Sequence, residues 1–291
     1  MSVPLPICSL NGDYLPLAEA QVSPLDRAFL FGDAVYEVLP IYAARPFRLR
    51  EHLERLDRSL AGIRMPPPLS HDGWAQLCRE LISRNAARDA YLYLQVTRGA
   101  EFGRNHAWPD GLKPTLFAYV TALEPMPPSI LEQGVSAVTA ADTRWARRDI
   151  KSTALIANIL LKKLAADAGA FETIMLENGE LTEGSSTTVH VVKSGVIHTP
   201  PNGRHILPGT TRDVVTELAA RLGVRSESGR VSETHLRAAD EIWLAFSTRG
   251  VLPVTALDGA PIGSGRPGPL FQRMSAAFAD YTLELAGTPA L

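Results

Sequence analysis

Lys151 is the residue of this sequence that is best placed to act as a reactive amine. It ends a charged segment that begins at Asp142, and it precedes apolar residues that predict a helix over 152–168. At the start of that helix, the positive end of the dipole disfavours a cation, so an amine there can be kept partly neutral for chemistry. A solvated surface lysine is the alternative, because lysines with shifted pKa values are uncommon. The apolar residues recur at helical spacing and would form the packed face: Leu155, Ile156, Ile159, Leu160 and Leu164.

The other lysines are weaker candidates for covalent chemistry. The chain has 29 basic residues, and only five of them are lysines. Lys113 precedes a proline in a loop, and Lys193 lies in a predicted hairpin turn. Lys162 and Lys163 follow the apolar stripe, where long side chains reach water. Elimination therefore leaves Lys151.

Three turns rich in small polar residues could bind an anion. The stretch "PGTTRD" places Gly209, Thr210 and Thr211 at the start of a predicted helix, where backbone N–H groups and the helix dipole attract a phosphate. The turns "EGSSTT" and "FSTRG" put further hydroxyls at strand ends. Each turn taken alone is also explained by helix capping or by an ordinary turn. Together with an isolated lysine, they indicate a phosphorylated carbonyl cofactor that forms a Schiff base.

The composition argues against several other classes of protein. A net charge of −2 and a pI near 6.4 disfavour a nucleic-acid partner bound through a basic face. Cys8 and Cys78 are the only cysteines and give neither a disulfide framework nor a zinc spacing, so we expect no metal. The start "MSVPLPICSL" lacks the regions of a signal peptide, and no apolar run reaches the ~18 residues of a membrane span. We therefore expect a cytoplasmic protein with no membrane partner.

The elements that must position these residues predict an α+β fold in two domains. The proline-rich stretch "EPMPPS", about 124–129, is the predicted linker between a domain of residues 1–123 and one of residues 130–291. In the first domain, residues 50–62 read as an amphipathic helix, and "YLYLQVTRG" and "TLFAYVTAL" as two strands that could pair. Turns are expected at Asn11-Gly12, Asn178-Gly179 and Ser194-Gly195.

A long loop joins the two predicted strands of the first domain. It spans residues 99–114, and 16 residues is longer than a compact domain usually accommodates without a functional reason. Arg104 and His106 are two residues apart in it, so in an extended backbone both side chains can project the same way. A solvated basic turn is the alternative interpretation.

Six motifs together resemble the fold-type IV pyridoxal-phosphate-dependent aminotransferases, and most closely the D-amino-acid aminotransferases. They follow the family's order and span almost the whole chain. The resemblance implies pyridoxal 5'-phosphate as cofactor, a homodimer, and an active site between a small N-terminal α/β domain and a larger, β-barrel-like C-terminal domain with helices. The motifs are "DRAFLFGDAVYEV" (26–38), "EHLERL" (51–56), "QVTRGAEFGRNHAWP" (95–109), "DIKSTAL" (149–155), "LTEGSSTTV" (181–189) and "ILPGTTRDVV" (206–215).

The resemblance also implies roles for particular residues. Lys151 is similar to the lysine that binds the cofactor and then moves protons, and Glu183 to the carboxylate beside the pyridine nitrogen. Tyr36 matches an active-site tyrosine. Without the family, Glu183 could be a solvated turn acid and Tyr36 a core residue. The implied phosphate contacts are Arg55, Thr210, Thr211 and Ser247, although Arg55 could instead make surface ion pairs.

Arg104 and His106 resemble the pair that binds the substrate carboxylate in D-amino-acid enzymes, a guanidinium that can bind bidentately with an imidazole beside it. Three departures from the family pattern bear on the preferred substrate side chain. The approach to Arg104, "AEFG", is one residue longer, Pro40 replaces a basic residue, and Phe246 stands where a small polar residue is usual.

The implied activity is a ping-pong transamination between a D-amino acid of the D-alanine type and a 2-oxo acid such as 2-oxoglutarate. Three alternatives share the fold: a branched-chain L-amino-acid aminotransferase, an (R)-amine transaminase and an aminodeoxychorismate lyase. A vitamin-B6 carrier is the alternative outside enzymology. The pair formed by Arg104 and His106 favours the D-amino-acid interpretation over these.

Overall fold

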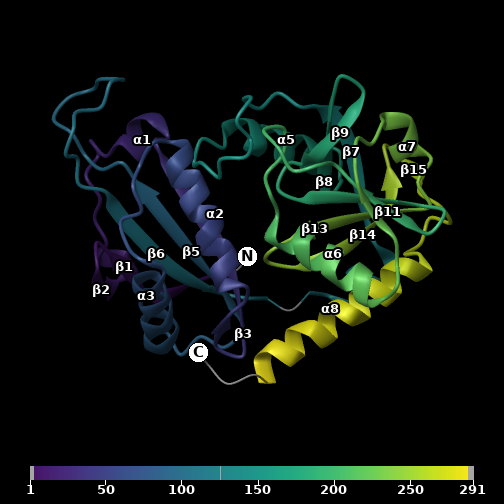
Figure 1. Ribbon diagram of the computed structural model, residues 1–291, viewed down its shortest axis with the longest axis horizontal. Helices are drawn as coiled ribbons and strands as arrows, with labels where there is room; N and C mark the ends of the chain where they lie inside the picture. The colour runs from purple at the N-terminus through teal and green to yellow at the C-terminus, as the bar shows by residue number, and fades with distance from the viewer. Residues whose placement is uncertain (1–2, 125, 288–291) are drawn as a thin grey trace. The chain divides into compact units, whose positions relative to one another are not determined.

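A computed structural model of the protein describes residues 3–124 and 126–287, and its mixture of helices and strands confirms the predicted α+β class (Figure 1). The described chain forms two compact units. Unit 1 contains the residues up to Glu124 together with Ile150–Ala154, and unit 2 contains the residues from 126 to Asp149 and Leu155–Glu284. The short segment 150–154, which carries Lys151, therefore groups with the N-terminal unit.

Unit 1 is built on an antiparallel sheet whose strand order is β2-β1-β6-β5-β3-β4. The expected hairpin at Asn11-Gly12 joins β1 to β2, and both residues have the positive φ that such a turn needs. The predicted pairing of β5 with β6 is also present, from Ala90↔Ala122 to Thr97↔Thr115. The strands are β1 (Pro4–Leu10), β2 (Asp13–Pro16), β3 (Ala34–Tyr42), β4 (Arg45–Pro46), β5 (Ala90–Thr97) and β6 (Thr115–Ala122).

Unit 1 also contains helices, of which α2 and α3 pack against the sheet. They are α1 (Arg27–Phe31), α2 (Leu49–Gly62) and α3 (His71–Arg84), with a short 3-10 turn, η1 (Leu17–Glu19). The amphipathic helix predicted over 50–62 is α2, which contacts β3. Its apolar face, with Leu53, Leu56 and Leu60, packs against alternate residues of β3 and β5 such as Leu39 and Leu94. The buried side chains of the strands alternate along the chain, and those of the helix recur about every 3.6 residues, so each element contributes one face to this core.

Unit 2 is built on a nine-stranded sheet with the order β12-β11-β10-β13-β14-β7-β8-β9, and β15 pairs with β14. The turns expected at Asn178-Gly179 and Ser194-Gly195 join β8 to β9 and β10 to β11, again with positive φ. The strands are β7 (Val135–Ala141), β8 (Glu172–Glu177), β9 (Glu180–Gly184), β10 (Thr188–Lys193), β11 (Val196–Thr199), β12 (Ser226–Ser228), β13 (Glu241–Phe246), β14 (Gly250–Leu257) and β15 (Ala260–Pro261).

The helices of unit 2 are α4 (Pro128–Gln133), α5 (Ile156–Asp167), α6 (Thr210–Arg221), α7 (Glu233–Arg237) and α8 (Pro269–Gly287). Helix α5 connects β7 to β8, which are parallel, as a crossover connection requires. The core gathers the inward residues of β10, β13 and β14, among them Val191, Leu244 and Leu252. Helix α6 contacts β13, a central strand of the sheet.

The prediction for the helix after Lys151 is wrong in two respects. The helix begins at Ile156 and not at 152, because Ser152 and Thr153 pair with β3 instead. The expected packed stripe is also largely exposed, because α5 buries Leu161 and Ala165 on its other side. We call the exposed residues the apolar face of α5: Ile156 (70% exposed), Ile159 (60%), Leu160 (63%) and Leu164 (44%).

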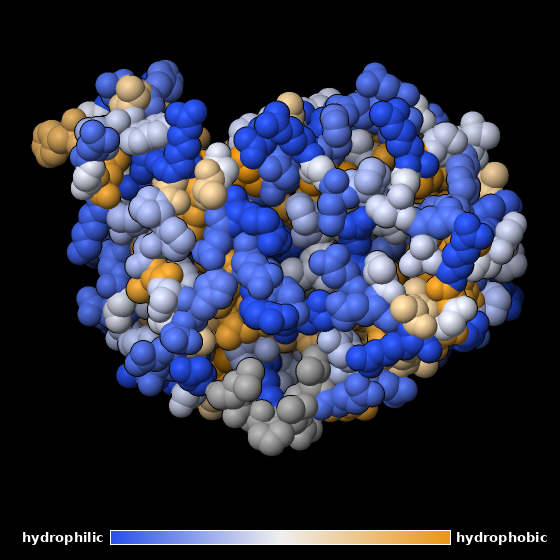
Figure 2. All heavy atoms as spheres, in the orientation of Figure 1, coloured by the Kyte–Doolittle hydropathy of each residue, from blue (hydrophilic) through white to orange (hydrophobic). Residues whose placement is uncertain are grey.

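The rest of the visible surface is mixed in character. Figure 2 shows a face on which hydrophilic residues dominate and apolar residues are scattered among them. Within the described residues, no helix combines the length and the apolar character needed to cross a bilayer.

Candidate active site

Lys151 is held against the start of β3 by backbone pairing. The Tyr36 amide donates to the Lys151 carbonyl at 2.9 Å, and the Thr153 amide donates to the Ala34 carbonyl at 3.0 Å. The Lys151 amide in turn donates to the Ser59 hydroxyl at 3.2 Å. These bonds bring two predicted residues together, because the Lys151 Nζ lies 4.3 Å from the centre of the Tyr36 ring. An ammonium at that distance from an aromatic face is attracted to it.

Contrary to the prediction from the sequence, Lys151 does not lie at the N-terminus of a helix. The sequence predicts Lys151 at the N-terminus of a helix, but α5 begins at Ile156 and belongs to unit 2. The helix dipole acts mainly within the first turn, and Lys151 lies outside the first turn of α5. The surroundings of Lys151 in unit 1 come from β3 and α2 instead.

A buried ion cluster lies on the same two elements, β3 and α2. The Arg55 guanidinium donates to Glu37 through Nε and Nη2, each at 2.7 Å, and the His52 Nδ1 is 2.7 Å from Glu37 Oε2. All three side chains are nearly inaccessible. Burial alone would raise the pKa of Glu37, but Arg55 and His52 outweigh it and hold that pKa below its usual range. Burial lowers the pKa of the His52 imidazole, and Glu37 opposes that shift only in part.

Arg55 therefore has a fixed orientation, which the sequence did not predict. His52 and Arg55 are three residues apart on α2 and so share a helical face. Glu37 directly follows Tyr36, and successive strand residues point to opposite faces of the sheet. The signal for the cluster was present in the motifs "VYEV" and "EHLERL", but nothing local shows that the two motifs meet.

Glu183 is a buried carboxylate in unit 2 that accepts hydrogen bonds from two residues. Arg144 Nη1 donates to its Oε1 at 2.5 Å, and the Leu207 amide lies 3.1 and 3.2 Å from its two oxygens. Arg144 is itself held by Asp142, through Nε at 3.0 Å and Nη2 at 2.7 Å. Burial raises the pKa of Glu183, and Arg144 and Leu207 act against that shift. Glu183 is therefore no solvated turn acid, and Arg144 is a partner of Glu183 that was not predicted.

The start of α6 is tightly packed. The first helical bond runs from the Asp213 amide to the Gly209 carbonyl. The amides that precede Asp213 therefore form the positive end of the helix dipole. A Cβ at Gly209 would lie 2.6 Å from the Thr188 hydroxyl, which only glycine avoids. Thr210 and Thr211 are both 5% exposed. Ser247 lies in the turn between β13 and β14 and is partly buried.

The third polar turn has a structural role. In "EGSSTT", the hydroxyls of Ser185, Ser186 and Thr187 all donate to the buried carboxylate of Glu172. The interpretation as a mere turn is therefore correct for these three hydroxyls. Glu172, on β8, was not identified from the sequence.

Arg104 and His106 meet on one aromatic ring in unit 1. The Arg104 Cζ lies 4.9 Å from the centre of the Phe31 ring, and the His106 ring centre lies 5.4 Å from it. Both side chains are exposed, as a pair that binds a diffusing carboxylate must be. The two side chains therefore share a side of the loop, as their spacing predicted.

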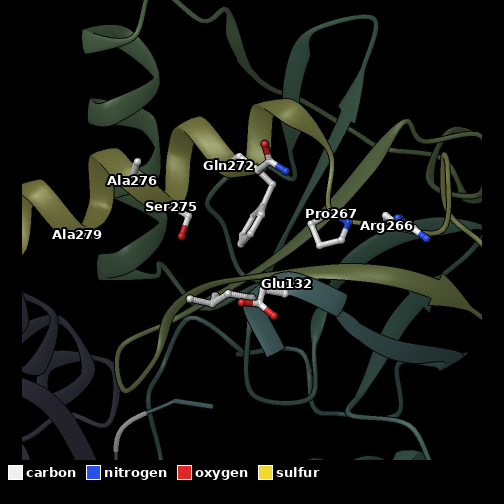
Figure 3. A pocket seen from close by; sticks show the side chains of 9 residues that line it. Glu132, Arg266, Pro267, Gln272, Ser275, Ala276 and Ala279 are labelled. Atoms are coloured by element: carbon white, nitrogen blue, oxygen red, sulfur yellow. The ribbon is translucent and has the colours of Figure 1, made fainter. Parts of the chain in front are cut away.

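One pocket of about 590 Å³ lies elsewhere in unit 2 (Figure 3). Gln272, Ser275 and Ala276 line it from α8, and Glu132 and Arg266 line it from neighbouring segments. None of its lining residues is a predicted site residue. Among residues 3–124 and 126–287, no group of His, Cys, Asp and Glu is arranged to hold a metal ion.

The fold and these residues define a class of enzyme. The amino-transferase class IV family matches residues 34–257, which include Lys151, Glu183 and the start of α6. The chain belongs to this family and is an aminotransferase. The predicted family is thereby confirmed.

Particular relatives narrow the comparison. The chain is 41% identical to the D-alanine aminotransferase of Bacillus licheniformis over 94% of this chain and 96% of that protein. It is 36% identical to the D-alanine aminotransferase of Staphylococcus aureus (strain MSSA476) over the same shares of the two chains.

Solved structures of the same fold type are also similar. The branched-chain amino acid aminotransferase of Escherichia coli superposes with a TM-score of 0.88 at 29% identity, covering 95% of this chain and 94% of that one. A second branched-chain amino acid aminotransferase, solved with pyridoxamine 5'-phosphate, also reaches 0.88, at 27% identity, covering 96% of this chain and 94% of that one. The predicted fold type IV is confirmed by these neighbours.

Proposed function

We propose that this aminotransferase exchanges an amino group between a D-amino acid of the D-alanine type and a 2-oxo acid such as 2-oxoglutarate. The observation that carries the proposal is the meeting of Arg104 and His106 on the Phe31 ring, in a chain whose sequence relatives include D-alanine aminotransferases. A guanidinium and an imidazole side by side suit a carboxylate. The two substrates would bind in turn, the first leaving as a 2-oxo acid before the second arrives.

Pyridoxal 5'-phosphate fits the types of donor that the chain offers. Glycine at 209 leaves room that any side chain would fill, at the start of a helix where anions bind. Thr210, Thr211 and Ser247 would hold the phosphate, and Arg55 would supply a positive charge. When bound, the cofactor supplies an aldehyde that condenses with amines and a ring that accepts electron density from the substrate Cα.

Lys151 would do the covalent and proton-transfer work. Its backbone is tied to β3, so its amine can move while its Cα stays in place. Tyr36 keeps the amine beside its ring, 4.3 Å from the centre. Once an incoming amino acid has displaced it, the Lys151 amine can remove the proton from the substrate Cα and later give a proton back.

Glu183 would pair with the ring nitrogen of the cofactor. Arg144 and the Leu207 amide favour its ionised form, and an ionised carboxylate keeps that nitrogen protonated. Asp142 accepts two hydrogen bonds from Arg144 and so orients the Arg144 guanidinium toward Glu183. Glu183 would thereby strengthen electron withdrawal at the substrate Cα.

A homodimer is also proposed. The apolar face of α5 presents four large aliphatic side chains to solvent, and contiguous apolar patches of this kind commonly mark protein contacts. The same helix in a second copy would offer the same face, as a two-fold interface requires. The cytoplasmic location stays a prediction from the sequence.

A coupled assay with D-alanine and 2-oxoglutarate tests the proposed activity. We expect pyruvate and glutamate in equal amounts, with L-alanine and L-leucine consumed far more slowly. Preference for L-leucine would favour a branched-chain enzyme, which the structural neighbours make the best second candidate. Pyruvate from aminodeoxychorismate without an acceptor would indicate a lyase, and cofactor binding without turnover would indicate a carrier.

A further inference from the structure

The loop that carries Arg104 and His106 is anchored at its base. Gly99 has a φ of 99°, and a Cβ there would lie 2.0 Å from the Lys113 carbonyl oxygen, so the two ends of the loop meet at a position only glycine can occupy. The Arg27 amide donates to the Gly99 carbonyl at 2.9 Å. Between these ends, residues 101–109 form no helix or strand, so no backbone ladder fixes the middle of the loop.

The side chain of Arg27 reaches the middle of the loop. Its Nη1 donates to the Asn105 carbonyl at 2.6 Å, and its Nη2 donates to the His106 carbonyl at 3.1 Å. The same Nη1 also pairs with the Glu101 carboxylate. One planar guanidinium thus binds the backbone at the two residues that follow Arg104. That backbone orients both His106 and Arg104.

Arg27 is itself rigidly placed. It is 3% exposed, and its Nε donates to Asp33 at 2.9 Å. Asp33 also accepts from Arg98, at 2.8 and 3.0 Å, so the carboxylate is fixed from a second side. The Cζ of Arg27 lies 4.6 Å from the centre of the Phe31 ring, the ring that Arg104 and His106 also contact. Phe31 and Arg27 therefore form one support beneath the loop.

We propose that Arg27 is a positioning residue that holds residues 101–106 so that Arg104 and His106 are presented together to the substrate carboxylate. The inference rests on the proposed function, because it takes Arg104 and His106 as the carboxylate-binding pair. Arg27 is buried and does not need to touch the substrate. Its planar fork suits two carbonyls and two carboxylates at once, which the single ammonium of lysine cannot satisfy in the same geometry.

The first experiment compares Arg27→Met and Arg27→Lys with wild type. Both variants should raise KM for D-alanine by roughly tenfold or more, the scale of one lost hydrogen bond to a charged group, while kcat and cofactor absorbance change little. Arg27→Lys keeps a positive charge beside Asp33 and Glu101. It is therefore the variant in which KM is measured if Arg27→Met does not fold. Equal falls in kcat and in cofactor content, with KM unchanged, would overturn the proposal and leave Arg27 a fold residue.

A double-mutant cycle separates positioning from general stability. If Arg27 acts through Arg104, then Arg27→Met should add little to the KM of an Arg104→Ala enzyme. Fully multiplicative effects of the two substitutions on KM would contradict the inference. Glu101→Gln is the matched control, because it removes the loop charge and leaves the two carbonyls bonded. A KM effect as large as that of Arg27→Met would assign the role to the ion pair and overturn the backbone mechanism.

Trypsin provides a readout that does not depend on activity. Arg104 is an exposed tryptic site, and cleavage after it requires the loop to open locally. Arg27→Met should be cut there several-fold faster than wild type, as measured by the masses of the two fragments. If Arg27→Met is cut faster but the wild-type enzyme does not turn over D-alanine, the proposed function is refuted. The conclusion that Arg27 stabilises the loop would still stand. A different result would refute only the positioning role of Arg27. In that case Arg27→Met would be cut at the wild-type rate and keep the wild-type KM, although the wild-type enzyme uses D-alanine and depends on Arg104.

Discussion

At the scale of single residues, Lys151 carries the strongest consequence. In the proposed mechanism, replacing it with alanine removes both the amine that would bind the cofactor and the base beside the Tyr36 ring. General acid–base catalysis alone contributes typically about 10²–10⁴-fold, so Lys151→Ala should lose at least that much turnover. Single-turnover rates with D-alanine measure this loss. Lys163→Ala, at an exposed position on α5, is the control and should keep full activity. Borohydride reduction that labelled any other lysine would disprove the assignment.

Glu183 gives the second prediction at this scale. Glu183→Gln leaves a neutral amide beside Arg144. In the proposed site, the ring nitrogen of the cofactor would then lose its anionic partner. The rates of the proton-transfer steps should fall by a larger factor than the affinity for the cofactor phosphate. Rapid-scan spectra measure the rates, and cofactor titration measures the affinity. Glu180→Gln, on the same strand but exposed, is the matched control. Unchanged single-turnover rates in Glu183→Gln would make the residue structural only.

Arg104 gives the third, which concerns handedness. In the proposed mechanism, Lys151 would fix the face at which the proton is exchanged. The side of the site that receives the carboxylate would then decide the configuration of the product. Arg104→Ala should lower kcat/KM for D-alanine by the equivalent of roughly 1.5–3 kcal/mol, the range for a hydrogen bond to a charged group. (R)-1-phenylethylamine, which has no carboxylate, should be affected much less, and L-leucine is the third substrate to compare. Equal losses for all three substrates would end the carboxylate interpretation.

The sequence indicated individual candidate residues better than the contacts that those residues make. Lys151, Tyr36, Glu183 and the turn at Gly209 could be recognised because each stands in a local motif. Glu37, His52 and Arg144 act through contacts between segments far apart in the chain, such as the 39 residues that separate Arg144 from Glu183. Spacing along the chain does not reveal pairs of this kind. A burial pattern in which charged residues fall on the inner face of α2 is the one signal that could have suggested the cluster.

At the scale of elements, turns and strand pairs were predictable and the boundary of α5 was not. Asn-Gly and Ser-Gly turns depend on local backbone preference, so they appear where expected. The predicted helix included residues 152–154, but Ser152 and Thr153 bond to β3, which lies more than a hundred residues earlier. That long-range pairing outweighs a local helical tendency worth a few tenths of a kcal/mol per residue.

The apolar face of α5 yields a prediction at the same scale. Ile159→Glu places a charge at the centre of that face, where each buried aliphatic side chain would contribute ~1.5–3 kcal/mol to an interface. Analytical ultracentrifugation should show a dimer for wild type and a weakened dimer for the variant. Gln76→Glu, which adds the same charge on an exposed position of α3, is the control and should leave the assembly unchanged. A monomeric wild type would remove the basis for the proposed dimer.

At the scale of the whole molecule, the buried cluster of Glu37, His52 and Arg55 ties stability to pH. The pKa of His52 is lowered in the folded protein, so between the ordinary value of about 6.5 and the folded value the unfolded chain binds a proton that the folded chain does not. Stability should therefore be full above about pH 6.5 and fall as the pH drops through that window. Glu37, whose pKa is also lowered, extends the loss to more acidic pH. Urea midpoints at pH 7.5 and 5.5 should differ less in His52→Asn than in wild type, and an equal difference would contradict this account.

The membership of Ile150–Ala154 in unit 1 has a consequence for how the protein can be made and divided. A ribosome that has released only the first 124 residues has not yet supplied the segment that bonds to Ala34, Val35 and Tyr36. Unit 1 can therefore reach its final hydrogen bonding only after much of the following chain has been synthesised. For the same reason, two fragments produced by cutting near residue 125 would not each be self-sufficient. The fragment holding β3 would lack Lys151, and reassembly of the two pieces would be needed before either could support catalysis.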